Sequence, residues 1–265
     1  MFTSLCTKTR QRPSAFKWLV VTAACLALAG CVNPESDKHA TPAPSTAAPE
    51  AVHAQATPTP SPSAAPASAV SEPQAWQSLF DGKTLAGWRE TQFAGHGGAH
   101  VENGNLVVDA GGGLSGVNYT NTFPKINYEF VLEAKRVEGS DFFCGITFPV
   151  GDTFASFIVG GWGCCIVGVS SVNGEDASQN ETSSTMAFEK GRWYRIRLRV
   201  MAAKIEAWID DKQVVDLETT DKRISLRYGE IELSKPFGLA TWVTTAAWRD
   251  IRLRQLEPKA GTVGK

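Results

Sequence analysis

Apolar side chains occupy every second position along much of the chain after residue 75, a period that is typical of half-buried β-strands. Residues 128–135 place Tyr128, Phe130 and Leu132 on one face of such a strand. Residues 193–200 repeat the pattern and alternate their apolar positions with arginines. Convincing helical periodicity is lacking, so the pattern predicts an all-β domain.

Turn signals join several of these strands into hairpins. Asn103-Gly104 lies between two apolar-rich arms, and both residue types tolerate the positive φ angles of a tight turn. A second hairpin is predicted over residues 204–216 with its turn at Asp210-Asp211, and residues 248–256 form a final strand. We count about a dozen strands, at spacings typical of a sandwich of two antiparallel sheets. Residues 74–257 suffice for one such core.

Glu129 and Glu133 lie on the same, largely polar face of the strand at 128–135. Their Cα atoms would be about 13 Å apart, which is long for a pair of retaining glycosidase carboxylates. We therefore expect two solvated carboxylates that pair with the stripe formed by Arg195, Arg197 and Arg199.

The overall charge favours neither nucleic acid nor another highly charged partner. The chain has 26 Lys and Arg residues against 27 Asp and Glu residues, a formal net charge of −1. A nucleic-acid-binding domain usually carries a basic surface, so we expect no nucleic-acid partner.

The first thirty residues have the pattern of a lipoprotein signal peptide. A basic start precedes the apolar run 18–29, which is too short to span a bilayer as a helix. The run ends in Leu28-Ala29-Gly30-Cys31, which resembles the bacterial lipobox. The resemblance implies that Cys31 is lipid-modified and attached to the membrane, and the absence of aspartate after it favours the outer membrane. The alternative is an ordinary secretory signal.

Two further segments are predicted to lack a packed core. Residues 31–73 hold nine of the fourteen prolines together with many Ala, Ser and Thr residues, and they contain no aromatic residue. This composition cannot bury enough apolar surface to offset the entropy of ordering, so we predict a disordered tether. Residues 258–265 are predicted to be a flexible tail.

Several segments of the predicted domain resemble the 3-keto-disaccharide hydrolase domain family. The resemblance rests on residues 78–88, 128–134, 191–198 leading into 205–210, and 248–253. It implies a concanavalin-A-like jelly-roll sandwich and an oligosaccharide or glycoside as partner. It also implies a reaction in which a ketone at C3 acidifies the C2 hydrogen, so that a base can remove it and the C1 substituent is expelled.

The central part of the domain differs from the family pattern. Residues 140–148 replace the Asn-Ser-Gly-aliphatic stretch that is typical of members, so no catalytic residue is carried over by position. Acidic residues nevertheless gather around the glycine-rich segment 160–163. These acids are Asp141, Asp152, Glu175, Asp176 and Glu181.

Among these residues we predict specific roles. Asp176 and Glu181 are the candidates for a general base or for metal ligands, since residues 173–181 offer enough oxygen atoms for a Ca²⁺-like divalent ion. Trp162 is predicted to stack against a sugar, with Asp141 and Asp152 as further substrate contacts. The alternatives are a solvated acidic loop and a Trp162 that fills the core.

Three cysteines follow Cys31 in the predicted domain, and export permits a disulfide. Cys144 is expected to pair with Cys164 or Cys165, because adjacent residues of a strand face opposite sides and would not bridge each other comfortably. Buried free thiols are the alternative.

Two functional hypotheses follow from these patterns. The first is an envelope-anchored enzyme that cleaves glycosidic bonds of 3-keto-disaccharides or glycosides. The second is a non-catalytic, lectin-like module that binds a glycan or a protein.

Overall fold

A computed structural model describes residues 74–257 of the protein. The predicted signal peptide, Cys31, the tether and the C-terminal tail lie outside the described residues. Within residues 74–257 no helix has the length and apolar character needed to cross a membrane.

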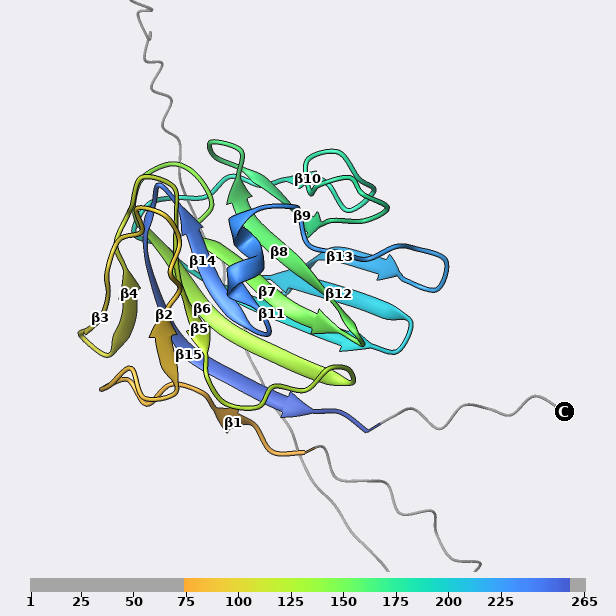
Figure 1. Ribbon diagram of the computed structural model, residues 1–265, viewed down its shortest axis with the longest axis horizontal. Coiled ribbons are helices and arrows are strands. Elements are labelled where there is room, and N and C mark those ends of the chain that lie inside the picture. Colours follow the sequence, from red (N-terminus) through yellow and green to blue (C-terminus); the bar gives the residue numbers. More distant parts are fainter. Residues whose placement is uncertain (1–73, 258–265) are drawn as a thin grey trace, which may run out of the picture. The chain divides into compact units, whose positions relative to one another are not determined.

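The described chain is built almost wholly from β-strands, with one short 3₁₀-helix (Figure 1). The elements, in chain order, are β1 (Gln77–Ser78), β2 (Trp88–Glu90), β3 (Ala99–Glu102), β4 (Asn105–Val108), β5 (Leu114–Tyr119), β6 (Tyr128–Glu138), β7 (Cys144–Val150), β8 (Thr153–Gly161), β9 (Ile166–Ser170), β10 (Ser184–Thr185), β11 (Trp193–Met201), β12 (Lys204–Ile209), β13 (Lys212–Glu218), η1 (Glu230–Ser234), β14 (Gly238–Trp242) and β15 (Thr245–Gln255).

The strands form two antiparallel sheets. One has the order β13-β12-β11-β6-β15-β4-β3, with the short β1 paired to β15, and the other has the order β10-β9-β8-β7-β14-β5-β2. Sheet neighbours such as β6 and β15 are far apart in the sequence, as in a jelly roll. The predicted all-β jelly-roll sandwich is confirmed.

The core lies between the sheets and is supplied by alternate residues of both. Strand β6 contributes Tyr128, Phe130 and Leu132, and the facing sheet contributes Phe157 and its neighbours. Because every second side chain enters the core, the intervening side chains must lie on the outer faces of the sandwich.

Both predicted hairpins form, and their turn residues adopt the expected conformations. Asn103 and Gly104 join β3 to β4 with φ angles of 50° and 80°. Asp210 and Asp211 join β12 to β13 with φ angles of 48° and 65°.

The segment that opens the family resemblance is part of the scaffold. Asp81 accepts hydrogen bonds from the backbone N–H groups of Thr84 and Lys83, which lower the pKa of its carboxyl group. Trp88 lies in the edge strand β2, and its indole N–H donates to the carbonyl of Leu79 at 2.8 Å. These contacts close one edge of the sandwich.

The expectation that Glu129 is solvated was wrong. Its side chain is only 1% exposed, because the guanidinium groups of Arg197 and Arg254 cover it on the outer face of the eight-stranded sheet. Arg197 Nη1 lies 3.0 Å from one carboxylate oxygen, and Arg254 Nε lies 2.7 Å from the other. Arg197 also stacks on Trp208, 3.7 Å from the ring centroid. One carboxylate therefore joins strands β6, β11 and β15.

Replacing Glu129 with glutamine removes the negative charge that two arginines share and keeps the size of the side chain. We expect Glu129→Gln to lower the free energy of unfolding by about 2 kcal/mol, since Arg197 and Arg254 would then lie together without a counter-charge. Denaturant unfolding measures the difference.

Glu133→Gln is the matched control. Glu133 pairs with Arg249 at 2.6 Å on the same sheet face, but this pair is in contact with solvent. We expect a loss of about 0.5 kcal/mol or less for such an exposed pair. Equal losses in the two variants would contradict a special role for the buried carboxylate.

Candidate functional site

A groove of about 500 Å³ lies against the outer face of the seven-stranded sheet, a size typical of ligand sites. It lies partly over strands β5, β8, β9 and β14 and partly under η1 and the loop before it. Figure 1 shows η1 lying against this sheet, and its contacts are with β5 and β14. The lining residues are Leu114, Asp141, Phe142, Ser156, Ile158, Trp162, Ser170, Arg227, Tyr228, Glu230, Ile231 and Trp242.

The floor of the groove consists of the side chains that alternate with the core. Ala155, Phe157 and Val159 of β8 enter the core, so Ser156 and Ile158 face outward. Ser156 exchanges a hydrogen bond of 2.9 Å with the Thr147 hydroxyl on β7. The strand pattern therefore sets a small, partly polar floor on which a ligand can rest.

A small apolar cluster fixes η1 above this floor. Phe93, Leu114 and Ala240 form it, and Ile231 of η1 and Phe142 pack against them. The cluster thereby places Glu230, the first residue of η1, at the groove.

Three large aromatic side chains line the groove and are exposed to solvent. The exposed fraction is 41% for Trp162, 43% for Trp242 and 96% for Tyr228. They come from the turn after β8, the end of β14 and the loop before η1. Exposed aromatic groups that gather at one groove mark a binding surface. Trp162 is not a core residue.

The charged groups of the groove are Asp141, Arg227 and Glu230. Both oxygens of Asp141 are engaged, since they accept hydrogen bonds from the backbone N–H groups of Phe142 at 2.7 Å and Gly163 at 2.8 Å. Glu230 Oε1 accepts one hydrogen bond, from the Ala94 N–H at 3.1 Å. Arg227 and Glu230 thus bring one positively charged and one negatively charged side chain to the same groove.

The structure does not bring Asp176 and Glu181 together. Asp176 accepts hydrogen bonds from the backbone and hydroxyl of Ser178, and its other oxygen lies 3.9 Å from Arg227. Glu181 pairs with Lys222 at 2.5 Å and does not line the groove. Asp176 therefore adjoins the groove through Arg227, whereas Glu181 faces solvent.

The acidic loop at residues 173–181 is held by Asn180. Its side-chain amide donates to the carbonyls of Val169, Glu175 and Asp176, at distances from 2.8 to 3.0 Å. Among residues 74–257, no three His, Cys, Asp or Glu side chains are grouped so that they could hold a metal ion.

Asp152 does not share the site of Asp141. It pairs with Lys125 at 2.9 Å, its side chain is 96% exposed, and it does not line the groove. Of the predicted substrate-binding residues, the structure places Asp141 and Trp162 together and leaves Asp152 elsewhere.

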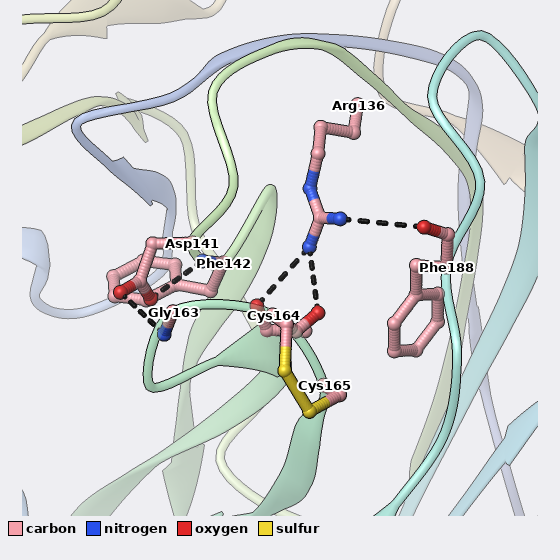
Figure 2. The surroundings of a disulfide bond; sticks show 8 residues. Arg136, Asp141, Phe142, Gly163, Cys164, Cys165 and Phe188 are labelled. Atoms are coloured by element: carbon pink, nitrogen blue, oxygen red, sulfur yellow. Dashed lines mark hydrogen bonds between the residues drawn. A yellow bond between two sulfur atoms is a disulfide. The ribbon is translucent and has the colours of Figure 1, made fainter. Parts of the chain in front are cut away.

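The expected pairing of Cys144 with Cys164 or Cys165 was wrong. Figure 2 shows a disulfide between the adjacent residues Cys164 and Cys165. The expectation assumed that both lie in an extended strand, but they lie in the turn between β8 and β9, where neighbouring side chains need not face opposite sides. Cys144 is a free thiol in the core, and burial raises its pKa well above the usual value.

Comparison with known protein families matches residues 75–254 to the 3-keto-alpha-glucoside-1,2-lyase-like domain. The chain belongs to this family. The resemblance drawn from the scaffold motifs is thereby confirmed, and the described part of the chain is a carbohydrate-active, glycosyl hydrolase-like domain. Comparison with curated proteins returns no significant match.

Solved structures with similar folds include three carbohydrate-related proteins. The carbohydrate-binding module CBM66 from Bacillus subtilis is 14% identical, with 64% of this chain and 96% of that chain covered and a TM-score of 0.43. Crh5 transglycosylase in complex with NAG is 13% identical, with coverages of 71% and 86% and a TM-score of 0.49. SCLam, a non-specific endo-β-1,3(4)-glucanase, is 12% identical, with coverages of 70% and 95% and a TM-score of 0.43.

Sequence reasoning predicted only Asp141 and Trp162 among the residues of the groove, and the charged or exposed aromatic residues that it missed are Arg227, Tyr228, Glu230 and Trp242. The first three lie in a segment without strand periodicity between β13 and β14. The signal that could have indicated them is an aromatic and charged run, Arg227-Tyr228-Gly229-Glu230, inside a long connection of a β-sandwich.

Proposed function

We propose that this domain of the 3-keto-alpha-glucoside-1,2-lyase-like family binds the sugar rings of a 3-keto-disaccharide or glycoside in the groove and cleaves the glycosidic bond. The observation that carries the proposal is the groove itself. Its three exposed aromatic side chains offer apolar faces to sugar rings, and its charged side chains lie beside them.

In the proposed reaction, Glu230 is the general base. Its carboxylate removes the proton at C2, which the neighbouring C3 ketone has made acidic. The electron pair of the C2–H bond forms an enolate with its negative charge on the C3 oxygen. The C3 ketone then re-forms as the C1–C2 double bond forms and the bond from C1 to the glycosidic oxygen breaks, and the leaving group takes up a proton from water. Glu230 is preferred because it is the one carboxylate besides Asp141 among the lining residues, and Asp141 is occupied by two N–H donors.

Arg227 is proposed to stabilise the negative charge that develops on the C3 oxygen. A guanidinium group is always protonated and offers donors to such an oxygen. Asp176, at 3.9 Å from Arg227, would then orient the guanidinium rather than act on the sugar. Glu181, which the sequence predicted as a base or metal ligand, is the alternative candidate for the base.

A second candidate is a lectin-like module that binds a glycan without cleaving it. One observation favours it. The aromatic side chains and the floor of the groove would suffice to bind a sugar. For catalysis the groove offers only one carboxylate that is not held by two backbone N–H donors, namely Glu230.

The assay uses the chain from residue 32 onward, 3-keto-disaccharides and their unoxidised parents, each with and without added divalent metal ions. We expect cleavage of the keto substrates alone, because only the ketone acidifies the C2 hydrogen. Glu230→Gln is expected to lower kcat by about 100-fold, the contribution of a general base. Chromatography of the released sugars measures the rate.

Glu181→Gln is the matched control and is expected to retain the rate, since Glu181 lies outside the groove. Loss of activity in Glu181→Gln but not in Glu230→Gln would identify Glu181, in the acidic loop at residues 173–181, as the base. Binding without cleavage of any substrate, by a folded protein, would support the lectin-like module and overturn the enzyme proposal.

We also propose that the chain is an outer-membrane lipoprotein, attached through Cys31 and the tether. The support is the lipobox-like sequence that ends at Cys31. A stable attachment of this kind takes more than one acyl chain.

Expression of the full chain in a bacterium tests the anchor. Cys31→Ser is expected to move the protein from the membrane fraction to the soluble fraction, because the acylated residue is lost. Cys25→Ser, a change inside the apolar run, is expected to leave the protein in the membrane fraction. A Cys31→Ser protein that stays with the membrane would contradict lipid attachment at this residue.

A further inference from the structure

Trp162 reaches the groove from an unusual backbone conformation. Its φ angle is 53°, in the left-handed region that a bulky side chain rarely adopts. Such a conformation persists only where the surrounding structure enforces it, and it often occurs at ligand-binding positions. The contacts that hold Trp162 in this conformation therefore help to shape the groove.

Hydrogen bonds fix the turn on both sides of Trp162. The N–H of Gly163 donates to Asp141 Oδ2 at 2.8 Å. The N–H groups of Cys164 and Cys165 both donate to the carbonyl of Gly161, at 3.3 and 3.0 Å. Asp141 lies in the loop between β6 and β7, so it ties the turn to a different part of the sandwich.

Arg136 of β6 holds the same turn through its guanidinium group. Its Nη2 donates to the carbonyls of Gly160 at 3.2 Å and Cys164 at 2.9 Å, and its Nη1 donates to the carbonyl of Phe188 at 3.4 Å. Figure 2 shows the guanidinium group pointing at the Cys164 carbonyl and Asp141 beside the Gly163 N–H. Arg136 is a buried residue, and its guanidinium carbon lies 5.0 Å from the Phe143 ring centroid.

Glycine is required where this arginine meets the turn. Gly160 has a φ angle of 79°, and a Cβ atom at this position would lie 2.6 Å from Arg136 Nη2. The close approach of Arg136 to the backbone therefore depends on glycine at position 160.

The Cys164–Cys165 disulfide covalently constrains the residues directly after Gly163. Cys164 is exposed and Cys165 is half-buried, so a solution reductant can reach the bond. Cys144, in contrast, is fully enclosed in the core.

We propose that Arg136, Asp141 and the Cys164–Cys165 disulfide act as a clamp that positions Trp162 in the groove, and that the sugar affinity of the groove depends on the oxidised state of this disulfide. The inference rests on the proposed function for its effect on sugar binding. The effect on the position of Trp162 rests on the hydrogen bonds of Arg136 and Asp141 to the turn and on the disulfide that follows it.

A dithiol reductant opens the clamp in two exchange steps. A thiolate of the dithiol attacks one sulfur, and the Cys164–Cys165 bond breaks. The second thiol of the reagent then displaces the first cysteine, so that the reagent ends as a disulfide. Two electrons and two protons pass to the protein, which ends with two free thiols. After reduction the turn keeps its hydrogen bonds to Arg136 but loses the covalent constraint of the disulfide. Trp162 is then held less firmly.

The test follows Trp162 directly, in the chain from residue 32 onward labelled with 5-fluorotryptophan. Seven tryptophans give seven ¹⁹F resonances, and Trp162→Phe and Trp248→Phe assign two of them. We expect dithiothreitol to shift or broaden the Trp162 resonance and to leave the resonance of the buried Trp248 unchanged. Peptide mass spectrometry after alkylation is expected to find new label on Cys164 and Cys165 and none on Cys144.

Variants separate the parts of the clamp. The double variant Cys164→Ser, Cys165→Ser is expected to place the Trp162 resonance where the reduced protein has it. Arg136→Met is expected to move the same resonance, and Arg136→Lys, which keeps a donor, to move it less. An unchanged Trp248 resonance in each variant verifies that the core is intact.

Sugar affinity is measured on a Glu230→Gln background, so that the 3-keto-disaccharide probe is bound and not consumed. Reduction is expected to raise Kd about tenfold, as for the loss of one well-placed aromatic contact. An unchanged Trp162 resonance, or an unchanged Kd in a protein that does bind the sugar, would overturn the inference and leave the proposed function intact. A Trp162 resonance that moves in a protein that binds no sugar would support the clamp and overturn the proposed function.

Discussion

The alternation of side chains across the seven-stranded sheet is the constraint on which the rest of the structure depends. Each strand must give one set of residues to the core, and this requirement leaves the other set on the outer face. In β8 the core takes Ala155, Phe157 and Val159, and Ser156 and Ile158 become the floor of the groove. The packing that stabilises the sandwich thus also determines the surface on which a ligand can lie. The loops contribute the sides of the groove.

The two outer faces of the sandwich meet this constraint differently. On the eight-stranded sheet, charged and aromatic side chains satisfy one another, as Glu129 does with Arg197 and Arg254 and as Arg197 does with Trp208. On the seven-stranded sheet the aromatic side chains at the groove are left exposed, and η1 covers only part of the face. Exposed aromatic side chains that gather at a groove favour binding, and for this reason we propose the second face as the site of function.

The fold could be predicted from the sequence because its signals are local. Asn103-Gly104, Asp210-Asp211 and the alternation in residues 128–135 each specify an element without reference to distant residues. The site could be predicted only in part. Trp162 lies within a conspicuous glycine-rich segment and Asp141 is among the acidic residues of the same central region, whereas Trp242 and Glu230 reach the groove only through sheet order and the packing of η1. The disulfide was missed because the turn that brings Cys164 and Cys165 together interrupts a pattern that reads as strand.

The most direct test of the central claim is a crystal structure of the Glu230→Gln variant in complex with a 3-keto-disaccharide. We expect the keto sugar to lie in the groove, with a ring against Trp162 or Trp242 and its C2 atom within reach of residue 230. We also expect its C3 oxygen to lie near Arg227. A sugar bound on the outer face of the eight-stranded sheet, or bound in the groove with C2 far from residue 230, would contradict the proposed mechanism.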